Sequence, residues 1–68
     1  MEEDVRLTAR EVDVLRQLAR GLTYAQAARE LCMSVHTAAT HVKNTYRKLG
    51  VHSAAAAVMQ AVRLGLIL

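Results

Sequence analysis

The sequence is poor in the residues that interrupt or cross-link a chain. It has no proline and only three glycines among 68 residues, and it shows neither a low-complexity linker nor an internal repeat. We therefore expect one domain over residues 1–68, with residues 1–6 as a flexible N-terminal segment. The one cysteine, Cys32, cannot form an internal disulfide, which agrees with a reducing compartment.

Long apolar runs are also missing. A run such as residues 64–68 is far shorter than the ~20 residues that a membrane-spanning helix needs. No arginine-flanked hydrophobic leader opens the chain, so the expectation is a cytoplasmic protein that makes no membrane contact.

Acidic residues are absent from the second half of the chain. All six lie among the first thirty residues, where five arginines accompany them and leave a net charge of −1. After Glu30 the only formally charged residues are four cations, Lys43, Arg47, Lys48 and Arg63. This one-sided charge favours a polyanionic partner, although a merely solvated basic face would give the same counts.

Helix-start and helix-stop residues recur along the chain and predict an all-α fold of four helices. A serine or threonine that can cap the first turn precedes each predicted helix, and the first two begin capping boxes with Glu11 and Gln26. The four caps are Thr8, Thr23, Ser34 and Ser53. Three glycines, Gly21, Gly50 and Gly65, can end the first, third and fourth helices. The predicted helices span about 9–20, 24–31, 35–49 and 54–64.

The third predicted helix has an apolar side and a polar side without carboxylates. Its apolar stripe is Val35, Ala38, Val42, Tyr46 and Leu49. A short helix, a three-residue connection and a longer helix form the helix-turn-helix layout, in which the second helix enters the major groove of DNA. We therefore expect the apolar stripe to pack on the first two helices and the polar side to face DNA.

The residues that carry a family pattern follow one another in order over nearly the whole chain, from residue 7 to about residue 66. They are Leu7, Thr8, Arg10, Glu11, Val14, Leu15, Gly21, Thr23, Ala28, Leu31, Ser34, Thr37, His41, Lys48, Leu49 and Val51. This set resembles the LuxR/FixJ-type DNA-binding domain, the four-helix module of many bacterial response regulators and quorum-sensing regulators. The resemblance implies a transcription regulator that binds a two-fold site in double-stranded DNA as a homodimer, and that can carry a sensory or receiver domain upstream.

The resemblance also implies which residues of the third helix read bases. They are His36, Ala39, Thr40, Lys43 and Asn44. Lysine can donate to guanine, asparagine can read adenine, and the methyl groups of Ala39 and Thr40 can meet that of thymine. Ala39 stands where relatives often have a lysine, so this protein is expected to read a different sequence. The alternative is a helix face that is only solvated.

A second set is expected to contact the phosphate backbone, because short hydroxyls and cations at helix starts and flanks commonly bind phosphate oxygens. It consists of Thr23, Thr37, His41, Arg47 and Lys48. Thr23 can equally serve only as a helix cap.

The fourth predicted helix is apolar on two sides. One stripe suffices for packing on the domain, and a second stripe, Ala55, Met59 and Val62, falls on what should be the outward side. A helix that is apolar all round is usually covered on all sides, and in the resembling family this helix is the dimer contact. The alternative is a modest exposed patch on a monomer.

Metal binding and catalysis are not expected. Cys32 and three histidines, His36, His41 and His52, lack the ligand spacing of a structural zinc site. Cys32 is instead expected at the turn position where a glycine would relieve strain. A chain this short has little interior for a catalytic pocket, and it has no glycine-rich phosphate loop. We therefore predict no cofactor and no enzyme activity.

Two rival interpretations remain open at this stage. The segment GLTYAQAA also resembles the second helix of sigma-factor region 4, from which a full fourth helix would distinguish the chain. The chain could also be a dimerisation or inhibitor module that uses the fourth helix and binds no DNA.

Overall fold

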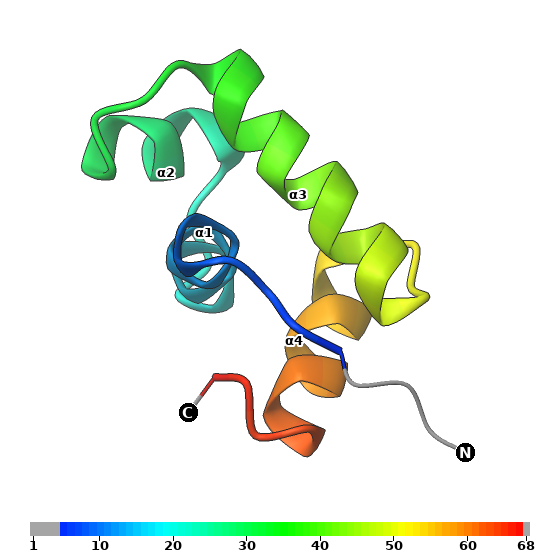
Figure 1. Cartoon of the computed structure of the whole chain (residues 1–68). Helices are drawn as coiled ribbons and strands as arrows, with labels where there is room; N and C mark the ends of the chain where they lie inside the picture. The colour runs from blue at the N-terminus through cyan, green and yellow to red at the C-terminus, as the bar shows by residue number, and fades with distance from the viewer. Residues whose placement is uncertain (1–4, 68) are drawn as a thin grey trace.

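The computed structural model describes residues 5–67, which form four α-helices joined by short turns (Figure 1). The helices are α1 (Ala9–Ala19), α2 (Tyr24–Glu30), α3 (Val35–Leu49) and α4 (Ala54–Arg63). Residues 5–67 contain no strand. The prediction of an all-α fold is confirmed, and each predicted bound agrees to within one residue because positions 20, 31 and 64 are the C-caps of their helices.

Hydroxyl side chains cap the start of every helix, as the sequence predicts. In α1 the Thr8 hydroxyl accepts the Glu11 N–H at 3.1 Å, and the Glu11 carboxylate accepts the Thr8 N–H at 2.9 Å. The same reciprocal pair joins Thr23 and Gln26 at the start of α2. Ser34 and Ser53 cap α3 and α4 with single bonds. Each cap typically stabilises its helix by about 1 kcal/mol.

One type of turn ends all four helices. Two or three residues past the end of each helix, a backbone N–H donates to the carbonyl five residues earlier, in the pairs Leu22–Gln17, Met33–Ala28, Val51–Tyr46 and Leu66–Ala61. This bond pattern is the Schellman motif, which needs a left-handed residue just before that N–H. Glycine fills this position in three of the turns, and Cys32, with φ of 57°, fills it in the turn between α2 and α3. The expected place of Cys32 is therefore confirmed.

Helix α1 lies at the centre of the molecule, with α2 and α3 on one side of it and α4 on another (Figure 1). It contacts all three other helices. The main core cluster comprises Leu15, Leu49, Ala57, Ala61 and Ile67. Residues beyond the helices complete this core, since Val5 and Leu66 pack against it. Of the segment 1–6 that was expected to be flexible, residues 1–4 lie outside the described part of the chain.

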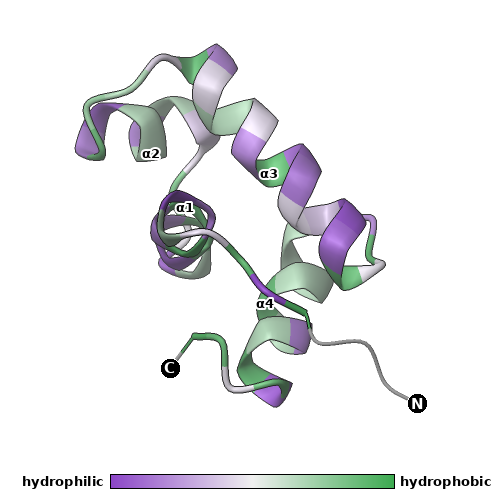
Figure 2. Ribbon diagram, in the orientation of Figure 1, coloured by the Kyte–Doolittle hydropathy of each residue, from purple (hydrophilic) through white to green (hydrophobic). Residues whose placement is uncertain are grey.

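The inner side of α3 differs from its predicted apolar stripe at two positions. Val35, expected to be packed, is 49% exposed, because the start of α3 extends past α1 (Figures 1 and 2). Thr45, which carries no apolar signal, is only 2% exposed. Its hydroxyl donates to the His41 carbonyl at 2.7 Å, so the buried oxygen remains hydrogen-bonded. The prediction for Val35 was wrong, and Thr45 takes a place in the packed side of the helix.

Candidate nucleic-acid interface

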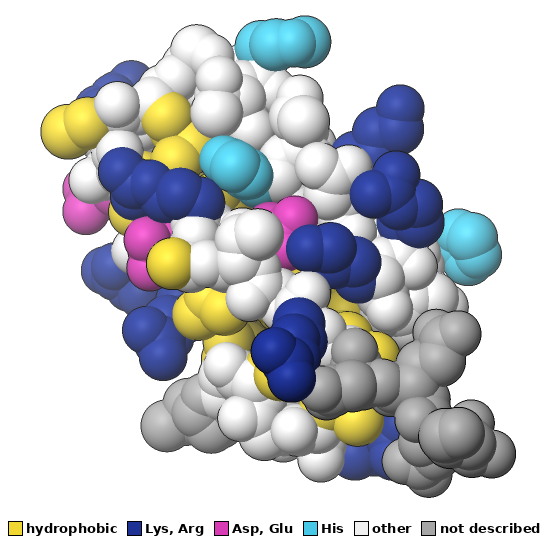
Figure 3. Space-filling view, in the orientation of Figure 1, with side chains coloured by type: hydrophobic (Ala, Val, Ile, Leu, Met, Phe, Trp, Pro, Cys, Tyr) yellow, Lys and Arg dark blue, Asp and Glu magenta, His cyan; other side chains and the backbone are white. Residues whose placement is uncertain are grey.

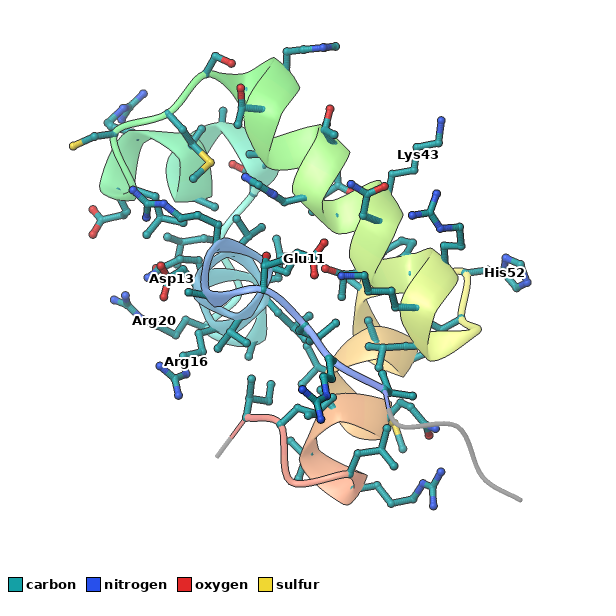
Figure 4. All side chains as sticks on the ribbon, viewed as in Figure 1. Glu11, Asp13, Arg16, Arg20, Lys43 and His52 are labelled. Atoms are coloured by element: carbon teal, nitrogen blue, oxygen red, sulfur yellow. The ribbon has the colours of Figure 1, made fainter. Side chains whose placement is uncertain are left out.

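The outward side of α3 carries the five residues predicted to read bases. His36, Thr40 and Lys43 are exposed, while Ala39 and Asn44 are half-buried at the edge of the face. The Lys43 side chain points away from the body of the molecule (Figure 4). The Thr40 hydroxyl donates to the His36 carbonyl at 3.0 Å, which fixes the orientation of the Thr40 side chain.

The residues predicted to contact phosphates have less uniform surroundings. Arg47 is exposed near the end of α3, and His41 is half-buried. The hydroxyls of Thr23 and Thr37 are exposed, and each accepts a hydrogen bond within its own helix start, from the Gln26 N–H and the Ser34 hydroxyl respectively. Both keep a hydroxyl proton that can be donated to a phosphate oxygen.

Lys48 is engaged with α1. Its Nζ lies 2.8 Å from Glu11 Oε1, the oxygen that also accepts the Thr8 N–H. The Glu11 side chain is 4% exposed and that of Lys48 is 32% exposed. Burial by itself would raise the pKa of the Glu11 carboxyl, but the hydrogen bonds from Lys48 and Thr8 and the lysine charge outweigh it, so the pKa is lowered from 4.5.

This ion pair joins two helices that are distant in sequence. The partners are 37 residues apart, and no local pattern pairs them. Lys48 therefore holds α3 on α1, and only its remaining N–H donors are free to meet a phosphate.

A groove of about 610 Å³ opens beside α3. Its lining comes from the first residue of α2, from α3 and from the turn that follows α3: Tyr24, Ala39, Val42, Lys43, Tyr46, Arg47, Gly50, Val51 and His52. We call it the α2–α3 groove. Sequence reasoning did not place Tyr24 and His52 beside α3, because they lie outside that helix and only the fold brings them to the groove.

The groove contains two neighbouring phenols. Burial, a hydrogen bond with Tyr24 and the charge of Tyr24 together raise the pKa of Tyr46 to about 12. Tyr46 therefore stays protonated and neutral at any physiological pH. A neutral phenol places no negative charge in the groove.

The described acidic residues lie away from the outer side of α3. They are Glu11, Asp13 and Glu30, which belong to α1 and α2. Asp13 points away from α3, together with Arg16 and Arg20, whereas Lys43 and His52 point outward on the opposite side (Figure 4). Figure 3 shows basic side chains along the α3 edge of the molecule. The outer side of α3 is thus the cationic, carboxylate-free surface that the charge distribution predicts.

The second apolar stripe of α4 is exposed. Met59 is 73% exposed and Val62 is 47% exposed, and Ala55 is exposed as well. A shallow apolar groove beside this stripe is lined by Leu18 and Ala19 of α1 together with residues of α4. The three residues predicted to form a dimer contact therefore share an accessible surface.

Residues 5–67 show neither a metal-binding cluster nor a membrane-spanning helix. No three His, Cys, Asp or Glu side chains among them gather closely enough to hold a metal ion. None of the helices they form combines the length and apolar character needed to span a bilayer.

Comparison with known proteins identifies the family. A family model described as bacterial regulatory proteins, LuxR family, matches residues 5–61. The chain belongs to the LuxR family. The complete α4 that follows the turn at residues 50–53 also separates this LuxR-family domain from the sigma-factor alternative.

Individual relatives agree with this assignment. The LuxR-family chain is 49% identical over 53 residues to a nitrate/nitrite response regulator protein homolog of Haemophilus influenzae, an alignment that covers 78% of this chain and 26% of the relative. It is 44% identical over 61 residues to a probable transcriptional regulatory protein NarL of Mycobacterium tuberculosis, covering 90% of this chain and 28% of that protein. The chain thus spans about a quarter of the length of these curated relatives.

Two solved structures share this fold. The transcription factor GerE superposes with a TM-score of 0.82 at 32% identity, covering 93% of this chain and 92% of GerE. The response regulator ChrA of a heme-sensing two-component system superposes with a TM-score of 0.89 at 38% identity, covering 97% of this chain and 33% of ChrA. Both likenesses extend over α1 to α4, so the helix-turn-helix arrangement is shared.

Proposed function

We propose that this chain is the sequence-specific DNA-binding domain of a bacterial transcription regulator, and that it acts with α3 in the major groove. The observation that carries the proposal is the outer side of α3, which is exposed, cationic and free of carboxylates while α1 and α2 hold the helix from behind. A B-form major groove, about 12 Å wide, admits one α-helix. Membership of the LuxR family supports the same function.

Recognition is divided among residues of α3 and Thr23, the cap of α2. His36, Ala39, Thr40, Lys43 and Asn44 face the base edges. Lys43 is the strongest reader among them, because its exposed ammonium group can donate to two acceptors of guanine. Thr23, Thr37, His41, Arg47 and Lys48 contact backbone phosphates and set the register of the domain on the duplex.

Two copies bind together on DNA. The exposed stripe Ala55, Met59 and Val62 is the dimer contact, and a two-fold axis then places the two α3 helices in successive major grooves about 10 bp apart. The operator is accordingly a rough palindrome. Residues 1–68 form one domain of such a regulator, which works in the cytoplasm where its DNA lies. A sensory or receiver domain upstream is in keeping with relatives that are named response regulators.

Selection of bound oligonucleotides from a random pool tests this function and yields the operator. On the selected site, Lys43→Ala is expected to reduce discrimination at one base pair by about 1 to 3 kcal/mol. Arg47→Ala, one helical turn further along α3, is expected to weaken binding to selected and unrelated duplexes alike. Measured dissociation constants on both duplexes separate these effects.

The dependence of affinity on salt separates DNA binding from a protein-interaction module. A domain that neutralises phosphates loses affinity with a slope of about −0.9 per contact in a plot of log affinity against log salt. A salt-independent response, or equal effects of Lys43→Ala on every duplex, contradicts the proposed assignment of α3.

A further inference from the structure

We propose that the α2–α3 groove receives the phosphate backbone of one DNA strand, with Tyr24 and His52 as contacts that flank the base-reading face. This inference rests on the proposed function and adds two residues from outside α3 to the interface. It also assigns a ligand class, the phosphodiester chain, to the α2–α3 groove as a whole.

The position of the groove supports this assignment. Ala39, Lys43 and Arg47 line it at intervals of four residues, so they follow one side of α3 over about 12 Å. Ala39 and Lys43 also belong to the face proposed to read bases. A strand whose bases meet that face must carry its backbone past the flank of the helix, and the groove lies along this flank.

The chemistry of the lining supports it as well. Lys43, Arg47 and His52 offer nitrogen donors from α3 and the following turn, and no carboxylate is among the lining residues. Phosphate oxygens only accept hydrogen bonds, so such a lining is complementary to them. Tyr24, 37% exposed at the first position of α2, adds a hydroxyl donor from a second helix.

The apolar floor sets the depth of the groove. Val42 is 3% exposed, and Tyr46 and Val51 are half-buried beside it. Val42 and Val51 carry no polar group that could bind a base edge, and the Tyr46 hydroxyl is hydrogen-bonded with Tyr24. A strand lying over them is therefore held by donors at the walls, and contacts of this kind fix register without reading sequence.

Two substitutions in the 68-residue chain test the proposal. Tyr24→Phe removes only the hydroxyl, and His52→Ala removes an exposed imidazole in the turn after α3. Each is expected to weaken binding to the selected duplex and to an unrelated duplex by the same factor, about three- to tenfold, which corresponds to one lost hydrogen bond. Arg16→Ala is the matched control, since Arg16 is exposed on the opposite side of the molecule, and it should leave both dissociation constants unchanged.

Duplexes with a single neutral methylphosphonate locate the contact. At the position where Tyr24 binds, replacing the phosphate should weaken the wild-type chain, and Tyr24→Phe should then cause no additional loss. The same cycle with His52→Ala should identify a different phosphate. Thermal unfolding of His52→Ala should match the wild type, because the imidazole is exposed. Tyr24→Phe also loses the hydrogen bond between Tyr24 and Tyr46, so its melting temperature is expected to fall slightly while the domain stays folded.

The outcomes distinguish a failure of the groove assignment from a failure of the proposed DNA-binding function. If both variants bind like the wild type while Lys43→Ala still reduces discrimination, the groove assignment fails and the proposed function stands. A change in base preference caused by Tyr24→Phe or His52→Ala would overturn the assignment to the backbone. If the wild-type chain binds no duplex even at low salt, the proposed function itself fails.

Discussion

At the scale of single residues, the Glu11–Lys48 pair has the largest consequences for stability. The Glu11 side chain is almost fully buried and the Lys48 side chain is about one-third exposed. The two ends of the pair therefore respond differently to substitution. Removing the lysine leaves a charge inside the molecule, whereas removing the carboxylate leaves a lysine that can turn toward water.

Lys48→Met is expected to destabilise the domain at pH 7 by about 3 kcal/mol, because it leaves the buried Glu11 carboxylate without its cation. This value is near the lower limit for breaking a buried ion pair, since the Thr8 N–H still binds the carboxylate. Glu11→Gln is expected to cost only about 1 to 2 kcal/mol, since glutamine can still complete the capping box. Urea denaturation of both variants measures the difference. Equal losses would show that the burial of Glu11 does not govern the pair.

The pH dependence of stability has a definite sign. The pKa of Glu11 is lowered from 4.5 in the folded protein, so its stabilising contribution is complete above pH 4.5 and is lost as the pH falls through the lowered folded value. In Lys48→Met the hydrogen bond and the charge of the lysine no longer lower this pKa, so the pKa of Glu11 is expected to lie higher in the variant than in the wild type. The deficit of that variant relative to the wild type should therefore shrink between pH 7 and pH 4. A deficit that stays constant over this range would argue against the assignment.

At the scale of secondary-structure elements, all four helices end in the same type of turn, the Schellman motif. The pairs Gly21–Leu22, Gly50–Val51 and Gly65–Leu66 each combine a left-handed residue with a half-buried apolar one, and Cys32–Met33 is the variant of this pattern. A left-handed conformation costs a non-glycine residue roughly 1 to 2 kcal/mol. The turn of the helix-turn-helix unit is therefore the strained one of the four.

Cys32→Gly is expected to stabilise the domain by about 0.5 to 1 kcal/mol, because strain relief exceeds the added entropy of the unfolded chain. For a domain of this size, that raises the melting temperature by several degrees. Gly50→Ala is the control with the opposite sign, since a Cβ there would meet no atom within 4 Å and only the φ of 69° opposes it. A lower melting temperature for Cys32→Gly would mean that the exposed thiol contributes to folding.

At the scale of the whole molecule, two exposed surfaces differ in their chemistry. The α3 side with its groove is cationic, and the stripe Ala55, Met59 and Val62 is apolar. A domain of 68 residues has a limited core. The apolar stripe that it leaves exposed on α4 is small, so two copies of the domain are expected to associate only weakly in the absence of DNA. DNA that holds two copies at a fixed spacing makes the second contact effectively intramolecular.

Met59→Glu is expected to leave the monomer folded, because Met59 is 73% exposed, and to abolish cooperative binding to a palindrome. Affinity for a duplex with one half-site should change little. Gln60→Glu is the matched control, since it adds the same charge to α4 outside the apolar stripe. Binding isotherms on one and two half-sites distinguish the variants, and cooperativity that persists in Met59→Glu would move the dimer contact to another surface.

The sequence by itself determined the four helices, their caps, the left-handed turn at Cys32 and the family. These features depend on interactions between residues at most five positions apart, or on the ordered residues that carry the resemblance. Only the tertiary structure decided that Val35 is exposed, that Thr45 is buried, that Lys48 pairs with Glu11 and that Tyr24 and His52 line one groove. The physical reason is that contacts between distant residues depend on the angle and offset at which the helices cross, and the local pattern of each helix does not encode these two quantities.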